Sequence, residues 1–402
     1  MKEALFAAKR KMSKSEVDDF DIAEKTRSNL FKWNGQFSPQ FVDALIEKYG
    51  KECKKIFDPF CGSGTVLVEA ARHTKSAAGT EINPAAVFIA RLYVFCNCSN
   101  EERTKHIRVV DKWINDDLLD DLPLFQSEGR IKNRLFYENA LQEKFKKTRV
   151  AEQKILIQAT ITLLDIYFDK NLTSKYISSN WEKIKAVVSS LPFSSASVDC
   201  VNNDCRESGY RDNEFDLLIT SPPYINVFNY HQQYRRSVEL MDYDLLKIAK
   251  SEFGANRKFR SNRFYTVIQY CIDMSQCIAE ASRVLKPGSR MIFVVGRKSK
   301  IRSVDFFNSE LVAAIGTIGN KLRIEEVKER KFKNRFGELI YEDIIVFENT
   351  NTYEIDIEES RKIALTALAS SVDSTANEII KKEIFQAIEC SSDIKPSPIY
   401  KR

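Results

Sequence analysis

The chain has 402 residues, of which 43% are hydrophobic and 29% charged, and its formal net charge at pH 7 is +6. This length suits one large domain with an added piece, and a charge this small for the length does not by itself indicate a nucleic-acid partner. No run of about 18 uncharged apolar residues occurs, which argues against a membrane-spanning helix. The opening segment, residues 1–20, lacks the apolar stretch of a secretory signal, so we expect a cytoplasmic protein with no membrane partner.

The nine cysteines and three histidines follow no metal-binding pattern. The cysteines are scattered, odd in number and without a repeated C-x-x-C pair, which is typical of reduced thiols in a core. No histidine stands at metal-ligand spacing from a cysteine pair. We therefore expect no metal site.

The first α/β unit is predicted within residues 52–95. A short apolar strand over 55–57 precedes a glycine-containing turn at 58–65, a helix over 66–72 and a second strand over 77–82. This order predicts the first half of a doubly wound, Rossmann-like sheet, with residues 1–97 as the N-terminal part of the domain.

Residues 98–195 form a charged region whose apolar residues recur three and four positions apart, which predicts a helical insertion. The α/β pattern resumes within 196–350, with strands over 198–201 and 215–220, a helix over 266–285 and a strand over 290–296. Two closing strands, over 322–328 and 339–347, are typical of an antiparallel edge. Residues 351–402 are expected to be a tail that is partly helical and mobile at its Pro/Ser-containing end.

The turn after the first strand, DPFCGSGT at 58–65, suits a nucleoside site. Gly62 and Gly64 let the backbone turn tightly and approach a ligand at a helix N-terminus. Glu81 closes the next strand, where a carboxylate can accept hydrogen bonds from two ribose hydroxyls. The P-loop lysine and serine or threonine are missing, so the nucleoside need not carry phosphates, and S-adenosylmethionine meets this requirement. An ordinary tight turn is the alternative, which the accompanying Asp58 and Glu81 disfavour.

A second motif, TSPPY at 220–224, follows the predicted strand over 215–220. An aromatic amine is a poor nucleophile because its lone pair is delocalised, so an enzyme must orient that pair. The Ser221 hydroxyl and a following backbone carbonyl can accept the two amino hydrogens, while Pro222 and Pro223 stiffen the loop. Tyr224 can stack on a base taken out of the helix. The alternative is a proline-rich turn without chemistry.

DPFCGSGT and TSPPY together resemble the DNA amino-methyltransferase family, whose first motif binds S-adenosylmethionine and whose second holds the target amine. The resemblance implies an α/β, Rossmann-like methyltransferase fold with a mixed sheet and a helical insertion. The stretch NGQFSPQF at 34–41 is similar to the family's amino-terminal cofactor motif. By this resemblance the cofactor-binding residues are Phe37, Ser38, Pro39, Asp58, Phe60, Gly62, Gly64, Thr65, Glu81 and Asp204, with Glu81 on the ribose and Asp204 on the adenine.

Ser221, the first residue of the loop over 221–224, favours N4 of cytosine as the methylated atom, since adenine N6 enzymes more often carry Asp or Asn there. Methylation of cytosine carbon 5 needs a thiolate, usually from a Pro-Cys pair, and no cysteine of this chain follows a proline. We therefore expect site-specific methylation of double-stranded DNA in a restriction-modification or related defence system, with a cognate restriction endonuclease as a candidate partner. The alternatives are an adenine N6 enzyme, an RNA guanine N2 methyltransferase, and a nucleic-acid-binding protein that has lost catalysis.

Basic residues interleaved with aromatic residues follow the second motif, and cations beside a catalytic loop suit phosphate contacts. The candidate nucleic-acid contacts are Arg235, Arg236, Arg257, Lys258 and Arg260. A solvated basic surface is the alternative. The insertion at 98–195 is either the target-recognition part or a support for the fold.

Overall fold

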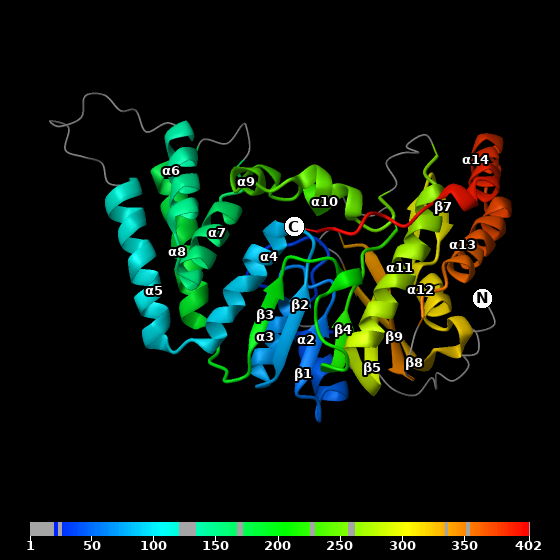
Figure 1. Ribbon diagram of the computed structural model, residues 1–402, viewed down its shortest axis with the longest axis horizontal. Helices are drawn as coiled ribbons and strands as arrows, with labels where there is room; N and C mark the ends of the chain where they lie inside the picture. The colour runs from blue at the N-terminus through cyan, green and yellow to red at the C-terminus, as the bar shows by residue number, and fades with distance from the viewer. Residues whose placement is uncertain are drawn as a thin grey trace.

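A seven-stranded sheet in the order β3-β2-β1-β4-β5-β9-β8 forms the centre of the protein (Figure 1). The computed structural model describes residues 20–22, 26–119, 134–166, 172–225, 230–255, 262–333, 337–350 and 354–401. The first five strands of the order are parallel, whereas β9 runs antiparallel to β5 and β8. The bounds are β1 Lys55–Asp58, β2 Ser76–Thr80, β3 Val198–Val201, β4 Phe215–Thr220, β5 Leu285–Gly296, β8 Leu322–Lys333 and β9 Leu339–Asn349. The predicted Rossmann-like mixed sheet is confirmed.

Alternate residues of the strands point to opposite faces of the sheet and build two separate cores. Ile56 and Leu217 belong to one core, and the adjacent Phe57 and Leu218 belong to the other. The first core is covered by α2 Pro39–Tyr49, α3 Thr65–Arg72, α4 Pro84–Ala90, α9 Arg235–Leu240 and α10 Leu245–Ser251. The second is covered by α11 Tyr265–Val284, α12 Asn308–Gly316, α13 Ile357–Ser371 and α14 Glu378–Glu389, with the short hairpin β6 Ser299–Ile301 and β7 Val304–Phe306.

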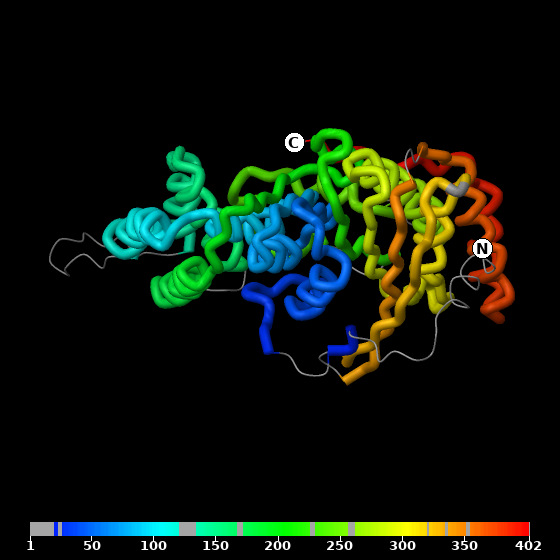
Figure 2. Tube along the Cα trace, turned by 90° about the horizontal axis from the view of Figure 1, so that it is seen from below, coloured from blue at the N-terminus to red at the C-terminus, as the bar shows by residue number. Residues whose placement is uncertain are grey.

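The region between β2 and β3 is helical, and it extends the molecule beyond the β3 edge of the sheet (Figures 1 and 2). Arg103 ties its two ends together, since Nε donates to the Phe95 carbonyl over 2.8 Å and Nη2 to the Pro192 carbonyl over 2.9 Å. The side-chain amide of Asn97 also donates to the Ser194 carbonyl over 2.9 Å. The chain therefore leaves and returns at one place, so the long insertion leaves the sheet undisturbed. Its elements are α5 Asn100–Lys112, the π-helix Trp113–Leu119, α6 Arg134–Lys147, α7 Ala151–Leu163 and α8 Ser174–Ser190.

Two expectations about chain segments are wrong. The strand expected over 290–296 begins at Leu285, because Leu285 already pairs with Phe215 before the register between β4 and β5 shifts. The Pro/Ser-containing end, expected to be mobile, is held against the domain, with Ser397 2% and Tyr400 4% exposed. Its polar groups find buried partners that lie far away in the sequence.

No helix within the described ranges combines the length and the apolar character needed to cross a membrane. All nine cysteines are free thiols. In the same ranges, no group of three or more His, Cys, Asp or Glu side chains could hold a metal ion.

Candidate active site

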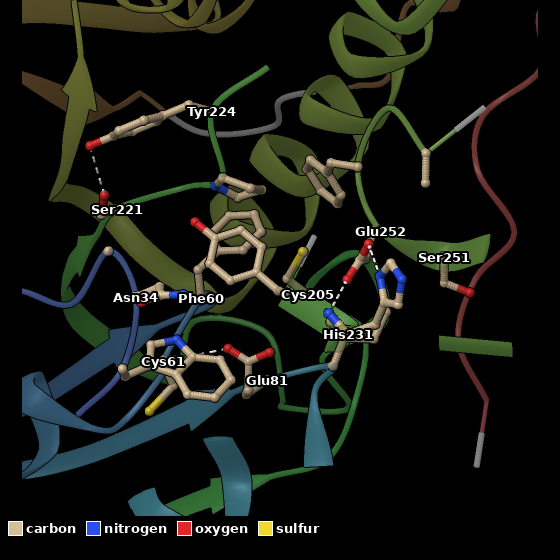
Figure 3. A pocket seen from close by; sticks show the side chains of 18 of the residues that line it. Asn34, Phe60, Cys61, Glu81, Cys205, Ser221, Tyr224, His231, Ser251 and Glu252 are labelled. Carbon is tan, nitrogen blue, oxygen red and sulfur yellow. Dashed lines mark hydrogen bonds and ion pairs between the residues drawn. The ribbon is translucent and has the colours of Figure 1, made fainter. Parts of the chain in front are cut away.

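A cavity of about 710 Å³ lies at the carboxyl ends of the parallel strands, where open α/β sheets bind ligands. Both sequence motifs line this cavity, one after β1 and the other after β4. Figure 3 shows Ser221 and Tyr224 at one end of the pocket, with Glu81, His231 and Glu252 toward the other. Of the candidate site residues, those that line it are Phe37, Asp58, Phe60, Gly62, Thr65, Glu81, Asp204, Ser221, Pro223, Tyr224 and Arg235.

Asp58 fixes the two motifs relative to each other from beneath the pocket. Thr220 Oγ1 donates a hydrogen bond to Asp58 Oδ1 over 2.6 Å, and the Phe60 amide donates to the same oxygen over 3.1 Å. Burial raises the pKa of Asp58 to about 7, while these two hydrogen bonds oppose the rise. Because Thr220 directly precedes Ser221, this contact sets where the second motif begins.

The two glycines of the first motif have different roles. Both have positive φ, +50° at Gly62 and +84° at Gly64, a conformation that favours glycine. Only Gly62 lines the pocket. A Cβ on Gly64 would lie 2.8 Å from the Tyr93 ring and 2.9 Å from Ala90 Cβ. Gly64 is thus needed for the close packing of the start of α3 against the end of α4 and the 3-10 helix Arg91–Asn97, and a bulky residue there would strain the fold itself.

Two backbone amides orient the carboxylate of Glu81, which directly follows β2. The Gly62 amide donates to Glu81 Oε2 over 2.9 Å, and the Asn83 amide donates to Oε1 over 2.8 Å. Burial raises the pKa of Glu81 to about 7, and the nearby Glu252 carboxylate adds to the rise. Each oxygen has a second acceptor position, so the carboxylate can take two hydroxyl donors while its orientation is fixed.

His231 and Glu252 form a polar pair in the pocket wall that the sequence did not indicate. His231 Nδ1 lies 2.9 Å from Glu252 Oε2, and the His231 amide donates to Oε1 over 2.8 Å. The pair joins the segment before α9 to the loop after α10. No local pattern marks either residue, because their contact depends on the path of the chain between them.

Asp204 lines the pocket, but both of its carboxylate oxygens already accept hydrogen bonds. Arg206 Nε donates to Oδ1 over 2.9 Å and Nη2 donates to Oδ2 over 2.7 Å. The Arg206 amide also donates to Oδ1 and the Tyr400 amide to Oδ2, each over 3.0 Å. These four donors occupy the acceptor positions that the resemblance assigned to adenine.

The amino-terminal motif lines the pocket mostly with residues that precede the predicted Phe37, Ser38 and Pro39. Ser38 caps α2 and Pro39 is buried in its first turn, and neither lines the pocket. The preceding residues do so, and Ser63 Oγ donates to Gln36 Oε1 over 2.8 Å, which joins this segment to the glycine turn. The lining residues of this segment are Trp33, Asn34, Gly35, Gln36 and Phe37.

The second motif presents Ser221, Pro223 and Tyr224 to the pocket, while Pro222 is buried and does not line it. Ser221 Oγ lies 3.5 Å from Tyr224 Oη. The tyrosine ring fits against Gly296 so closely that a Cβ there would lie 2.6 Å from Tyr224 Cε2. The loop therefore places a hydroxyl acceptor and an aromatic ring side by side.

The candidate basic contacts separate into three groups. Arg235 lines the pocket, and its Nε pairs with Glu239 Oε1 over 2.8 Å on the same helix. Arg236 does not line the pocket and pairs over 3.4 Å with Glu138 of α6, a buried carboxylate of the insertion. The remaining candidates, Arg257, Lys258 and Arg260, fall outside the described residues.

Comparisons with known proteins found similar sequences and folds. The sequence profile of a family described as DNA methylase matches residues 6–91. The chain is 22% identical to the Type II methyltransferase M.MvaI of Kocuria varians, over 69% of this chain and 78% of that protein. It is 26% identical to the Type II methyltransferase M.MjaII of Methanocaldococcus jannaschii, over 26% of this chain and 19% of that protein. A crystal structure of S-adenosylmethionine-dependent methyltransferases from Methanosarcina mazei aligns with a TM-score of 0.36 and 12% identity, over 77% of this chain and 98% of that one. The DNA methylase profile and the likeness to M.MvaI support the predicted resemblance of this chain to the DNA amino-methyltransferase family, whose methyl donor is S-adenosylmethionine.

Proposed function

We propose that this chain transfers the methyl group of S-adenosylmethionine to the exocyclic N4 amine of cytosine in double-stranded DNA. The observation that carries the proposal is the position of Ser221. Its hydroxyl lies in the wall of the pocket that also contains Glu81 and the glycine turn. A neutral hydroxyl at this position is the residue type that favours cytosine N4 over adenine N6.

The residues of the second motif orient the target amine. When bound, the cofactor supplies an electrophilic methyl group. Ser221 Oγ accepts a hydrogen bond from the amine and directs its lone pair, and the stiff Pro222-Pro223 pair keeps the acceptor in place. Tyr224, which lines the same end of the pocket, stacks on the flipped base. Together, the residues of the second motif hold the target nitrogen in line with the methyl group.

The nucleoside of the cofactor fits the opposite end. Glu81 accepts hydrogen bonds from the two ribose hydroxyls with the free acceptor positions left by Gly62 and Asn83. Phe60 and Phe253 lie edge to face with ring centroids 5.3 Å apart and offer an apolar surface for the adenine. We therefore assign the adenine contact to these rings instead of the engaged carboxylate of Asp204.

Adenine N6 is the second candidate target, because the matching family profile covers both N6 and N4 enzymes. The same loop can orient either amine. We further propose that the modified sequence is protected from a cognate restriction endonuclease, as expected of a Type II system. For target reading, the candidates are the helical insertion and the basic segment that begins at Arg235.

Expression of the chain in a host without its own DNA methylation provides the test. Host DNA and host RNA are digested separately to nucleosides, whose masses are measured, with a Ser221→Ala variant as the matched control. N4-methylcytosine that disappears in the variant supports the proposal. N6-methyladenine would show instead that adenine N6, the second candidate, is the target. Guanine methylated at N2 in RNA, or S-adenosylmethionine binding without any methylated nucleoside, would contradict both. One short sequence shared by all modified sites would support the site-specific role.

A further inference from the structure

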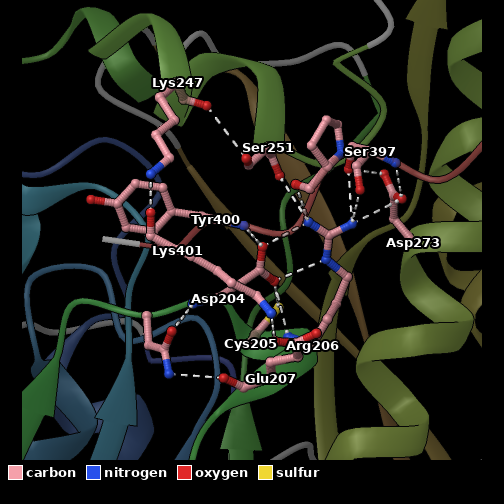
Figure 4. Close-up of polar contacts among 12 residues, drawn as sticks. Asp204, Cys205, Arg206, Glu207, Lys247, Ser251, Asp273, Ser397, Tyr400 and Lys401 are labelled. Carbon is pink, nitrogen blue, oxygen red and sulfur yellow. Dashed lines mark hydrogen bonds and ion pairs between the residues drawn. The ribbon is translucent and has the colours of Figure 1, made fainter. Parts of the chain in front are cut away.

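We propose that residues 397–401 contribute to the cofactor site. Docking of this segment strengthens cofactor binding, and cofactor binding stabilises the docked segment. Figure 4 shows Ser397 and Tyr400 beside Asp204, Arg206 and Asp273, and Asp204 also lines the cavity. The inference rests on the placement of the nucleoside at Glu81 proposed above. It does not depend on which base is methylated.

Arg206 is the centre of the network, and the segment supplies three of its acceptors, the carbonyls of Ser397 and Pro398 and the Ser397 hydroxyl oxygen. Its side chain is 1% exposed and forms ion pairs with Asp204 at 2.7 Å and Asp273 at 3.2 Å. Nη1 also donates to the Ser397 carbonyl over 2.8 Å, and Nη2 donates to the Pro398 carbonyl over 3.0 Å. A buried guanidinium that loses acceptors is costly, so Arg206 requires the segment in its docked position.

The segment in turn donates to both buried carboxylates. The Ser397 amide donates to Asp273 Oδ1 over 2.8 Å, and Ser397 Oγ donates to Oδ2 over 2.7 Å. The Tyr400 amide donates to Asp204 Oδ2 over 3.0 Å. Each carboxylate thus holds Arg206 on one side and the segment on the other, which makes the three parts interdependent.

Two connections lead from this network to the pocket. Tyr400 Oη donates to Asn202 Oδ1 over 3.2 Å, and Nδ2 of the same side chain donates to the Glu81 carbonyl over 2.9 Å, which supports the strand end that carries the ribose acceptor. The Gly254 amide donates to Asp273 Oδ2 over 3.0 Å, and Gly254 lines the pocket. The docked segment therefore braces both the ribose end and the facing loop.

The Arg206 guanidinium also supports an aromatic wall of the pocket. Its carbon lies 5.3 Å from the centre of the Phe253 ring, which meets Phe60 edge to face. Outside the network, Lys401 Nζ pairs with Glu207 over 3.0 Å at the surface, where such a pair contributes little. The buried contacts are therefore what couples the segment to the cofactor.

Coupling of this kind is reciprocal, so the cofactor must stabilise the docked segment as much as the segment strengthens cofactor binding. We expect S-adenosylmethionine to slow amide hydrogen exchange at Ser397 and Tyr400 by about tenfold in the full chain. Tyr400→Phe and Ser397→Ala should each weaken S-adenosylmethionine binding, measured by calorimetry, by about tenfold. Lys395→Ala is the matched control, because this exposed side chain lies two residues before the segment and outside the network.

Circular dichroism and the melting temperature without cofactor show whether each variant is folded. Tyr400→Phe keeps the ring and the backbone amide, so it tests the Asn202 connection even if Ser397→Ala fails to fold. Wild-type affinity in a folded Tyr400→Phe variant, together with exchange that the cofactor does not alter, would overturn the inference. An error in the nucleoside placement appears separately, because Glu81→Gln would then keep its cofactor affinity.

Discussion

Tyr224 Oη donates a hydrogen bond to Glu342 Oε1 over 3.2 Å, which links the loop over 221–224, after β4, to β9 on the far side of β5. The Glu342 carboxyl is largely enclosed, and burial raises its pKa above the ordinary value. Arg330 opposes that rise, since its Nη1 lies 3.6 Å from Glu342 Oε2, and its guanidinium lies 3.8 Å from the centre of the Phe41 ring. The position of the tyrosine is thus fixed by residues that precede and follow the loop over 221–224 by more than a hundred positions.

Tyr224→Phe should slow methyl transfer about tenfold, since it removes a hydrogen bond to a carboxylate and the link to Ser221 while it keeps the ring. Single-turnover kinetics with preformed enzyme–cofactor complex measure this step. Cofactor affinity should not change. Tyr341→Phe, at an exposed position of β9, is the control. An unaltered single-turnover rate in Tyr224→Phe would show that the tyrosine hydroxyl does not contribute to methyl transfer.

Gly296→Ala should displace the Tyr224 ring, because the added Cβ would lie 2.6 Å from Cε2. We expect weaker capture of the flipped base, by about 1 to 3 kcal/mol if stacking is lost altogether, with cofactor binding retained. The control is the same substitution in a Tyr224→Ala background. There, Gly296→Ala should add nothing further, and additive losses would mean that the two residues act independently.

Glu81→Gln should lower the affinity for S-adenosylmethionine by about tenfold or more. A side-chain amide has one acceptor oxygen, whereas two backbone donors and two ribose hydroxyls need the two acceptor oxygens of a carboxylate. The wild-type affinity should also depend on pH. With a pKa near 7 in the empty pocket, Glu81 becomes a better acceptor as it ionises, so affinity rises as the pH increases through about 7. Titration calorimetry of both proteins at pH 6 and 8 tests this, with exposed Glu47→Gln as control. The ratio of the two affinities should grow with pH, and a constant ratio would contradict the assignment.

Arg235 and Arg236 are neighbours in sequence but should give opposite results. Arg235→Gln should weaken DNA binding and flatten its salt dependence, because this side chain lies in the pocket wall and is half exposed. Arg236→Gln should leave the salt dependence alone and lower the free energy of unfolding by about 1 kcal/mol, since the buried Glu138 loses one of its cations. Binding titrations over a salt series and urea denaturation distinguish the two. Equal salt slopes for Arg235→Gln and wild type would exclude Arg235 from phosphate contact.

The parts of the structure that the sequence predicted are those controlled by short-range patterns. The strands over 198–201 and 215–220 have the predicted bounds, because each is an apolar run between turn residues. The glycine turn and the loop that begins at Ser221 also meet in one pocket as expected, because both follow parallel strands at the same edge of the sheet.

The parts that were missed depend on long-range contacts. The composition of the last ten residues is typical of a mobile tail, but Ser397 and Tyr400 are held by Asp273 and Asp204, which no local pattern connects to them. Gly64 was predicted to approach the cofactor, but it does not line the pocket; a positive φ serves close ligand approach and tight packing equally well, so the sequence could not separate the two roles.

Asp58→Asn should reduce the pH dependence of stability. The ordinary pKa of 3.8 is raised to about 7 by burial, so between about pH 4 and 7 the folded chain keeps a proton that the unfolded chain has lost. Stability then falls as the pH rises through this window and levels off above about pH 7. The amide variant cannot ionise but can still accept the hydrogen bond from Thr220 Oγ1. The difference in unfolding free energy between pH 5 and pH 8, measured in urea, should therefore shrink by on the order of 1 kcal/mol or more relative to wild type. Asp117→Asn, at an exposed position of the insertion, should leave that difference unchanged, and equal pH dependence in Asp58→Asn and wild type would mean that Asp58 is ionised in the folded protein throughout.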